Sequence, residues 1–374
     1  MPISFPGLFP GWEFNPDPVA IHIGHGIYWY GIILALGFLA GLLLCMKQAP
    51  KYGLTEDNVL DLVLWAVPCC VLGSRIYYVI FYLDLYRNPD GGLDWLRIVS
   101  VWDGGLAIYG TIIAGAIVAF LYTRRKKIPF GALADLAVMG LLLGQIIGRW
   151  ANFINREAFG GLTELPWRMR IWISAYQYAD VHPTFLYESL WNLAGLLLVL
   201  FIVSKGRRFD GENTWFYFLW YGLGRAWIEG LRTDSLYLFD WTFLGEPIRV
   251  SQALSMVLAA LSAVMLFYNI AIRKPSRENL LVCRTARQAQ EAAEAEAEAA
   301  LAAETAAAAA NAAQEAPASP APDAVETPEP ENAPESSETP APEAEEAPAP
   351  EAEDASDSAP EAEKAPGGDP PAAP

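Results

Sequence analysis

The segment GRWANFINREAFG, residues 148–160, places an arginine, two asparagines and a glutamate at the end of an apolar stretch. Arg149 and Asn152 are three residues apart, so on a helix their side chains lie on one face. The planar guanidinium group of arginine suits a phosphodiester, which it can bind through two hydrogen bonds. The alternative without a ligand is an arginine that extends to the lipid headgroups. Asn155 and Glu157 add hydrogen-bonding groups that this role does not need. We therefore predict that this segment binds a ligand.

A second set of polar side chains lies in YGLGRAWIEGLR, residues 221–232. Its members are spaced i, i+4, i+8 and i+11, which places them along one face of a helix. They are Tyr221, Arg225, Glu229 and Arg232. Such a face is either a set of ion pairs that packs helices together or the wall of a polar cavity. We expect Glu229 to pair with one arginine, so that the second arginine leaves positive charge for a ligand.

Further ionisable groups lie at or within apolar stretches, where they are costly and mark either a functional site or an ion pair between helices. In HPTFLYE, His182 stands before a proline near an expected helix start, a position that tolerates proline. Tyr187 and Glu188 follow in the first turns of that helix. The motif is as consistent with capping and packing as with direct chemistry. Arg75, in an earlier stretch, belongs to the same class.

Two tyrosines accompany glycines at the ends of apolar stretches. Tyr109 lies in WDGGLAIYG, residues 102–110, whose glycines permit a close approach of backbones. Tyr30 lies in YWYG, residues 28–31. Periodicity alone would assign both tyrosines to the aromatic belt at a membrane interface. Their position also makes them candidates for the fringe of a polar site.

The elements that must hold these residues are apolar. The chain has 374 residues, of which 53% are hydrophobic, and its mean hydropathy is +0.22, which is too apolar for an ordinary soluble domain. Seven stretches are long and apolar enough to cross a bilayer, for which a helix needs about 20 residues. They run approximately over residues 27–46, 59–83, 104–122, 131–149, 185–204, 214–231 and 250–272.

Basic residues at the ends of these stretches predict the orientation. RRKK (residues 124–127), KGRR (residues 205–208) and the cations within residues 273–277 all fall on one side. Cytoplasmic loops carry such an excess of lysine and arginine. The N-terminus then faces outward, and most ionisable groups in the spans lie in the outer half. Asp135 is expected near the cytoplasmic end.

The predicted fold class is an all-α polytopic membrane protein with seven transmembrane helices, a small external head domain and a disordered acidic tail. Residues 1–26 form an external N-terminal segment. Residues 27–275 form the seven-helix transmembrane body, with the external head at about residues 150–184. Within the head, WRMRIWISAY alternates in a way that suggests a short strand pair. Residues 276–374 form a cytoplasmic tail.

The tail carries the acidity of the whole chain, whose formal net charge is −18. From residue 288 to 374 it holds 22 acidic residues and one basic residue, a net charge of −21, whereas residues 1–287 carry +3. Its alanine-, proline- and glutamate-rich composition buries too little apolar surface to offset the entropy of ordering. We predict a disordered spacer with a short helix near residues 291–310.

Several arginines, few free carboxylates and a fringe of tyrosine and asparagine predict an anionic lipid headgroup as the ligand. The sequence has no nucleotide-binding motif, no hydrolase elbow and no usable metal-ligand spacing, so we expect neither a cofactor nor a metal, and no nucleic-acid partner. The competing hypothesis is an anionic-lipid or solute transporter, which predicts polar groups continuing to the cytoplasmic side. There the sequence offers only Asp135 and Gln145. A receptor or scaffold would explain the tail better than the buried arginines.

The same motifs resemble those of the bacterial prolipoprotein diacylglyceryl transferases. GRWANFINREAFG is similar to the family pattern G-R-x-G-N-F-x-N-x-E-x-x-G, and HPTFLYE, YGLGRAWIEGLRTD, YWYG and SRIYYV (residues 74–79) also match. The resemblance covers about residues 15–275. It implies a multi-pass enzyme of the bacterial cytoplasmic (inner) membrane that moves the diacylglyceryl group of phosphatidylglycerol to the lipobox cysteine of a prolipoprotein signal peptide. Glycerol phosphate is released and a thioether forms.

The resemblance also implies roles for matched positions. The phosphatidylglycerol-binding residues are Arg149, Arg225, Asn152, Gly160 and Tyr221. The catalytic candidates are Tyr109, Arg225, Tyr30 and Glu157. The supporting residues are Arg75, His182, Tyr187, Glu188, Asn155, Glu229 and Arg232.

Two positions depart from the family pattern. Ala151 replaces a glycine, a methyl-sized change that affects packing. Tyr109 stands where many members have a histidine that is a candidate for the base. A tyrosine is a poor base at neutral pH unless nearby cations favour its phenolate. Either Tyr109 is an oriented hydrogen-bonding group, or the base is His25, His182 or Glu157.

Overall fold

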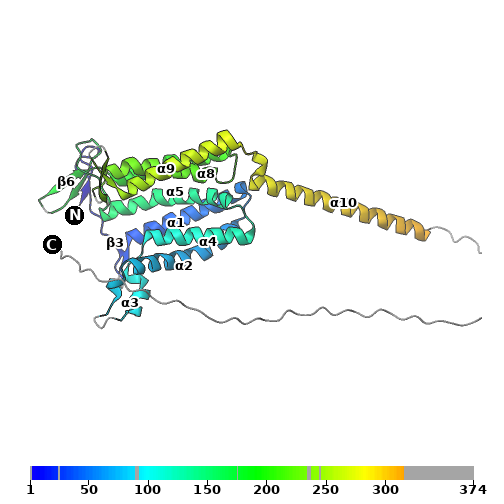
Figure 1. The fold of residues 1–374 in the computed structure, drawn as a ribbon, viewed down its shortest axis with the longest axis horizontal. Helices are drawn as coiled ribbons and strands as arrows, with labels where there is room; N and C mark the ends of the chain where they lie inside the picture. Colours follow the sequence, from blue (N-terminus) through cyan, green and yellow to red (C-terminus); the bar gives the residue numbers. More distant parts are fainter. Residues whose placement is uncertain are drawn as a thin grey trace, which may run out of the picture. The chain divides into compact units, whose positions relative to one another are not determined.

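The computed structural model describes residues 2–23, 26–88, 92–174, 176–233, 237–243 and 246–315. This part of the chain is mostly helical, and a helix lies over each of the seven apolar stretches. These helices are α1 (Trp29–Gln48), α2 (Glu56–Phe81), α4 (Ile108–Lys126), α5 (Phe130–Asn155), α6 (Thr184–Leu198), α8 (Glu212–Ile228) and α9 (Val250–Phe267). In Figure 1 they lie side by side, with β6 (Tyr178–Val181) and α3 (Trp95–Val99) at the same end.

Five helical segments among the described residues are long and apolar enough to cross a membrane. They are Trp29–Tyr52, Glu56–Phe81, Phe130–Asn155, Thr184–Gly206 and Val250–Arg273. Short turns extend three of them, namely η1 (Ala49–Tyr52), η4 (Val199–Val203) with α7 (Ser204–Gly206), and η6 (Tyr268–Arg273). The remaining two fall short, since α8 has only 17 residues and α4 ends in three cations. Length and composition therefore support five spans where the sequence pattern predicts seven.

Two pairs of helices pack closely at glycines. A Cβ atom on Gly41 of α1 would lie 2.8 Å from the carbonyl oxygen of Gly140 in α5. A Cβ atom on Gly110 of α4 would lie 2.3 Å from the carbonyl oxygen of Gly73 in α2. Small residues at such positions let helix backbones approach one another. Gly110 therefore has the packing role that WDGGLAIYG predicts.

We expect Gly110→Ala to lower the melting temperature of the purified protein in detergent, because the new methyl group pushes α4 away from α2. Overpacking of this kind costs about 1–3 kcal/mol. The control is Gly144→Ala in α5, where the added Cβ atom meets its nearest neighbour at 3.8 Å, an ordinary contact. Equal melting temperatures for the two variants would contradict the close packing of α2 and α4.

A four-stranded antiparallel sheet, in the order β2-β1-β5-β6, lies on the ends of α5 and α6. Its other strands are β1 (Ile3–Ser4), β2 (Glu13–Phe14) and β5 (Met169–Trp172). Buried residues of the sheet, Ile3 among them, pack against Phe153 of α5 and Phe185 of α6. The predicted strand pair is present as the β5–β6 hairpin, whose second strand begins later than WRMRIWISAY suggests. The N-terminal segment joins the sheet, so the fold is mostly helical and not all-α.

The remaining elements are short and connect the helices. Between α2 and α4 lie η2 (Leu83–Tyr86), α3 and η3 (Val101–Asp103). The strands β3 (Val19–Ile21) and β4 (Ile27–Tyr28) form one pair before α1, and β7 (Tyr237–Phe243) and β8 (Glu246–Arg249) form another before α9. The turns η5 (Glu229–Leu231) and η7 (Arg277–Asn279) follow α8 and η6.

The prediction of a tail disordered from residue 276 is wrong at its start. There α10 (Leu281–Glu315) forms a helix of 35 residues, longer than the expected helix at residues 291–310. Alanine and glutamate have high helix propensities, and Leu281 is packed against the helix core. The chain divides into two units, residues 1–310 and 311–374, and residues 316–374 lie outside the described part.

Candidate active site

A buried carboxylate on α6 joins three arginines from different parts of the chain. Glu188 is 4% exposed and pairs with Arg149 near the end of α5. It also pairs with Arg225 of α8 at 3.2 Å and with Arg232 at 3.9 Å. Burying a carboxylate is costly unless cations and hydrogen bonds compensate it. Glu188 therefore fixes the relative positions of these three guanidinium groups.

A second buried carboxylate, Glu229, belongs to the same group of charges. We call this group the arginine cluster and define it as Arg149, Arg225, Arg232, Glu188 and Glu229. Glu229, 3% exposed, pairs with Arg225 at 2.9 Å across one helical turn. This is the i, i+4 pair that the sequence predicts. Glu188 and Glu229 thus hold Arg149, Arg225 and Arg232 together at one place. The sequence pattern predicts few free carboxylates, and both carboxylates of the cluster are ion-paired.

A small cavity opens beside the cluster. Its volume is about 10 Å³, room for about one water molecule, and its lining includes Glu188, Tyr221 and Arg225. The aromatic ring of Tyr221 stacks on that of Tyr217 with centroids 5.6 Å apart. Tyr221 thus lies one turn from Arg225 on the same face of α8, at the edge of the buried charges.

The GRWANFINREAFG segment is linked to the cluster by a chain of hydrogen bonds. Arg149 donates to the Asn152 side-chain oxygen at 3.3 Å, and the Asn152 amide donates to Glu157 at 2.8 Å. Glu157 itself is exposed. Asn155 is the last residue of α5, and Arg156 then adopts the left-handed conformation at φ 55° and ends the helix. The segment therefore leads from a buried cation to an exposed carboxylate.

Gly160 closes the loop after α5 against two other elements. Its backbone N–H donates to the His182 carbonyl oxygen at 3.0 Å, and it forms an isolated β-bridge with Arg232. A Cβ atom at this position would lie 2.7 Å from the His182 Cβ atom and 3.0 Å from the Leu231 carbonyl oxygen. Only glycine leaves room for this contact, which holds the residues before α6 beside those after α8.

His182 precedes α6, and its ring is held by Tyr187 and Trp167. Its Nδ1 atom lies 3.2 Å from the Tyr187 hydroxyl group, which accepts a hydrogen bond of 2.7 Å from the Trp167 indole. The hydroxyl can therefore donate to a neutral imidazole. Partial burial lowers the pKa of His182 below its ordinary value.

We expect the wild-type protein to lose stability relative to His182→Gln as the pH falls from about 7 to about 5. The unfolded chain binds the proton first, because its histidine has the ordinary pKa of about 6.5. The stabilisation is complete above that value and is lost as the pH falls toward the lowered pKa of the folded state. Melting temperatures of both proteins across this range measure the effect, and parallel curves would contradict it.

Tyr30 is placed by the register of α1 against α5. A Cβ atom on Gly37 would lie 3.3 Å from the Gly144 carbonyl oxygen, and one on Gly148 would lie 3.3 Å from Leu34. Continuing this antiparallel register by one turn places Tyr30 level with Asn152. The side chain is half-exposed. Tyr30 and the GRWANFINREAFG segment therefore belong to the same end of this helix pair.

Two other predicted residues, Tyr109 and Arg75, are not joined to the cluster by any hydrogen bond or ion pair among the described residues. Tyr109 begins α4, and its ring lies 6.2 Å from that of Tyr77 in α2. Arg75 uses its guanidinium group on backbone carbonyls, donating to those of Ile98 at 2.7 Å and Gly104 at 2.6 Å. It therefore holds the connection between α2 and α4, and its supporting role at the anion site stays a prediction. His25 lies outside the described residues.

Asp135 is used at the opposite end of the helices. Its carboxylate accepts hydrogen bonds from the backbone N–H groups of Gly211 and Thr214, at 2.8 and 2.9 Å, and lies 3.7 Å from Arg207. It caps the start of α8. Asp135 is the one charged group that the transporter hypothesis could use on the predicted cytoplasmic side. Its contacts give it a packing role, so it does not support that hypothesis.

The sequence profile of the prolipoprotein diacylglyceryl transferase family matches residues 18–268. The chain belongs to this family. The match spans the arginine cluster and the sheet strands β5 and β6, and it ends before α10. In this family member, Ala151 takes the place of the glycine in the pattern and is fully buried in the packing of α5.

Bacterial proteins named phosphatidylglycerol–prolipoprotein diacylglyceryl transferase are similar to this family member over most of their length. One from Oceanobacillus iheyensis is 40% identical over 266 residues, which cover 67% of this chain and 88% of that protein. One from Lysinibacillus sphaericus is 38% identical over 274 residues, 71% of this chain and 96% of the relative. One from Listeria monocytogenes is 41% identical over 260 residues, 67% and 89% respectively.

Proposed function

We propose that this family member transfers the diacylglyceryl group of phosphatidylglycerol to the thiol of the lipobox cysteine in a prolipoprotein signal peptide. The sulfur forms a bond to the glyceryl carbon, the bond from that carbon to the phosphate oxygen breaks, and glycerol phosphate leaves with the electron pair. The observation that carries the proposal is the arginine cluster, in which Arg149 and Arg225 are held side by side, with its direct link to Asn152 and Glu157.

The cluster suits the leaving group. As the C–O bond breaks, negative charge grows on the phosphate oxygens, and fixed cations in a poorly hydrated site stabilise that charge. Arg149 and Arg225 are already held in place by Glu188, so little reorganisation is needed when the phosphate arrives. Asn152 orients Arg149, and Gly160 holds the loop beside them. Tyr30 and Tyr221 line the site.

The nucleophile comes from the substrate peptide. A free cysteine thiol has a pKa of about 8.5, and a positive field favours its thiolate. The partly exposed guanidinium groups of Arg149 and Arg225 provide such a field. Glu157, exposed and joined to the cluster through Asn152, accepts the thiol proton in this proposal, while Tyr109 acts as an oriented hydrogen-bonding group.

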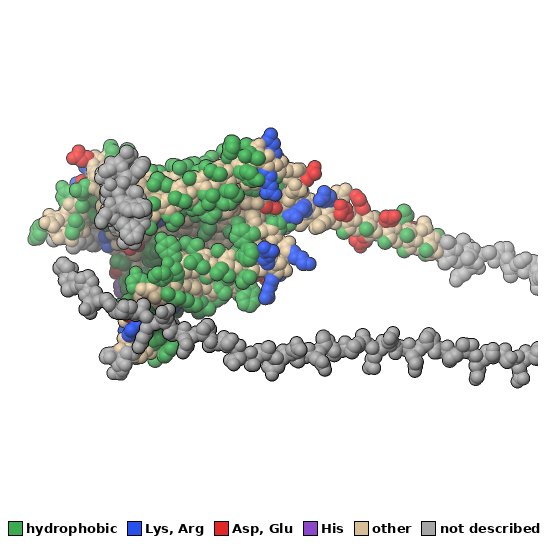
Figure 2. All heavy atoms as spheres, viewed as in Figure 1, with side chains coloured by type: hydrophobic (Ala, Val, Ile, Leu, Met, Phe, Trp, Pro, Cys, Tyr) green, Lys and Arg blue, Asp and Glu red, His purple; other side chains and the backbone are tan. Residues whose placement is uncertain are grey.

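The membrane placement is also proposed. All seven long helices cross the bacterial cytoplasmic membrane, with the N-terminus and the sheet outside and the acidic tail inside. Figure 2 supports this orientation, because lysine and arginine side chains gather at the helix ends away from the sheet while hydrophobic side chains cover the flanks. An excess of basic residues is typical of the cytoplasmic side. The arginine cluster then lies near the outer leaflet, within reach of phosphatidylglycerol and of an exported signal peptide.

The test is a reaction of the purified protein with radiolabelled phosphatidylglycerol and a synthetic lipobox peptide. Mass spectrometry of the peptide should show a thioether-linked diacylglyceryl group, and glycerol phosphate should appear in equal amount. A peptide with serine in place of the lipobox cysteine is the matched control and should stay unmodified. Absence of product with the cysteine peptide, in lipid that supports a related transferase, would refute the proposed activity.

A further inference from the structure

A cavity of about 530 Å³ lies where α4 turns into α5 and shares no lining residue with the arginine cluster. Its lining combines the side chains of Phe120, Arg124 and Phe130 with those of the connecting turn. We propose that this cavity binds the headgroup of an anionic phospholipid from the inner leaflet, with Arg124 as the ligand of the phosphate. The proposal rests on the membrane placement given above and not on the transferase chemistry.

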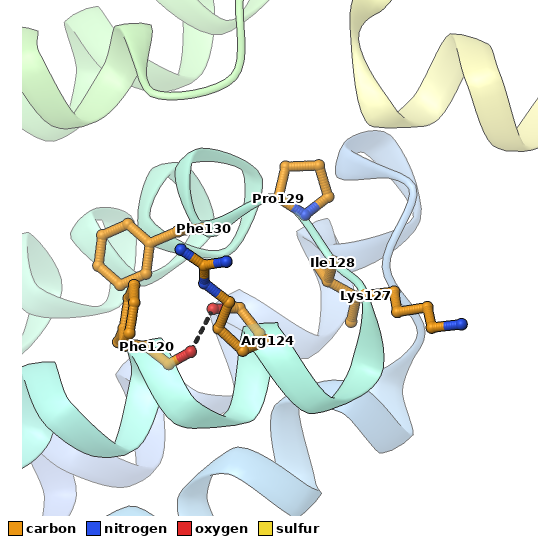
Figure 3. Close-up of a pocket in the computed structure, with 7 residues that line it drawn as sticks. Phe120, Arg124, Lys127, Ile128, Pro129 and Phe130 are labelled. Carbon is orange, nitrogen blue, oxygen red and sulfur yellow. Dashed lines mark hydrogen bonds between the residues drawn. The ribbon is translucent and has the colours of Figure 1, made fainter.

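The guanidinium group of Arg124 is directed at the cavity. Figure 3 shows it between Pro129 and Phe130, whereas the ammonium group of Lys127 points away from them. Its Cζ atom lies 5.0 Å from the centroid of the Phe120 ring. An arginine held over an aromatic face keeps its planar fork available for two hydrogen bonds to a phosphate.

Arg124 has positive charge to offer. No carboxylate lies within ion-pair distance of it in the described residues, and the nearby Lys126 differs, since it pairs with Asp61 at 2.9 Å. The side chain of Arg124 is also exposed. A cation without an acidic partner at the end of a membrane helix is attracted to anionic headgroups.

An apolar stripe on α4 leads directly to this arginine. Ile113, Ile117, Phe120 and Arg124 are spaced i, i+4, i+7 and i+11, so they lie along one face of the helix. The first three are 51%, 52% and 47% exposed. α4 packs lengthwise along α2, one of the five candidate spans, and its outer face therefore meets lipid. When an acyl chain lies along this stripe, the phosphate group of the same lipid lies level with Arg124.

The acidic tail of the chain is a weaker occupant. Residues 316–374 carry many glutamates, but Val325 is their only large aliphatic residue and they include no aromatic residue. Such a segment can neutralise Arg124, yet it has nothing to cover the apolar stripe. A phospholipid satisfies both features at once, which is why the geometry favours the lipid.

The test uses the full-length protein in nanodiscs of phosphatidylcholine with a small fraction of phosphatidic acid that carries a photoreactive group at the start of one acyl chain. After irradiation, mass spectrometry should find the label on peptides that cover residues 113–130. Arg124→Ala should lower this labelling about fivefold, which corresponds to about 1 kcal/mol for one basic residue near a charged surface. Arg125→Ala removes the same charge one residue away, outside the cavity lining, and should change the labelling by less than twofold.

Each alternative result would overturn the proposal. Equal losses in the two variants would indicate general attraction to a basic surface. Equal labelling with a photoreactive phosphatidylcholine, whose headgroup has no net charge, would show that the net negative charge of the headgroup is not recognised. Absence of label from residues 113–130 would exclude the lipid as the occupant, and this is also the result expected if the acidic tail fills the cavity instead. Circular dichroism spectra and melting temperatures of the variants verify that they are folded, and transferase activity does not enter the readout.

Discussion

Arg149→Ala is expected to lower diacylglyceryl transfer by roughly a hundred- to a thousandfold, the loss that follows removal of one fixed donor to a developing negative charge. The Arg149 side chain is 21% exposed and pairs with Glu188, so it is accessible to the phosphate of the proposed substrate and is already oriented. The variant should still fold, because Glu188 keeps Arg225 at 3.2 Å and Arg232 at 3.9 Å. Initial rates with labelled phosphatidylglycerol, together with the melting temperature, measure both effects.

Two further variants separate the charge of Arg149 from its geometry. Arg149→Lys keeps the positive charge but loses the two-pronged hydrogen bond, so its activity should fall between that of the wild type and that of the alanine variant. Arg125→Ala is the matched control, since it removes an exposed arginine at the far end of the helices and should leave the rate unchanged. A rate for Arg149→Ala within about threefold of the wild type would contradict phosphate binding at this position.

The helices could be predicted from the sequence because their apolar stretches are long. The predicted stretch at residues 27–46 compares with Trp29–Gln48, and the stretch at residues 131–149 with Phe130–Asn155. The second boundary was placed too early, since the apolar pattern stops at Arg149. The helix continues because Phe153 packs into the core of the sheet, a contact made by residues of the N-terminus and of β5 that no local pattern reveals.

The polar site was predictable only where its contacts are local. The pair Arg225–Glu229 follows from an i, i+4 spacing, and the link from Arg149 to Asn152 from an i, i+3 spacing. Glu188 meets its arginines across three helices, so its central position depends on tertiary packing. The sequence shows only that Glu188 is a charged residue in an apolar helix. Before its ion-pair partners are known, a packing role and a catalytic role explain this equally well.

The contacts of Arg75 and of the tail could not be predicted from the sequence. Arg75 was grouped with the site because it is a cation inside a span, but its partners are backbone carbonyls of the connection before α4. Those carbonyls come within hydrogen-bonding distance of Arg75 only after the connection has folded against α2. In the tail, the composition that predicts disorder also has high helix propensity, and the packing of Leu281 decides in favour of α10.

Glu188→Gln is expected to lower the turnover number about a hundredfold without raising the KM for phosphatidylglycerol. The neutral amide has nearly the same shape but no longer compensates Arg149, Arg225 and Arg232, whose guanidinium groups then repel one another. Small displacements of positioning groups cost about a hundredfold in rate. The extra positive charge, by contrast, favours an anionic lipid, so substrate affinity should hold or increase.

The same variant should unfold at a lower temperature than the wild type, because breaking a buried ion pair by removing one partner costs about 3–5 kcal/mol. Phosphatidylglycerol should raise the melting temperature of Glu188→Gln more than that of the wild type, since a ligand that binds only the folded state stabilises it in proportion to its affinity. Glu164→Gln makes the same charge change at an exposed site and should alter neither rate nor stability. A raised KM with an unchanged turnover number would instead identify Glu188 as a direct contact of the lipid headgroup, because only loss of a binding contact weakens affinity while leaving the chemical step intact.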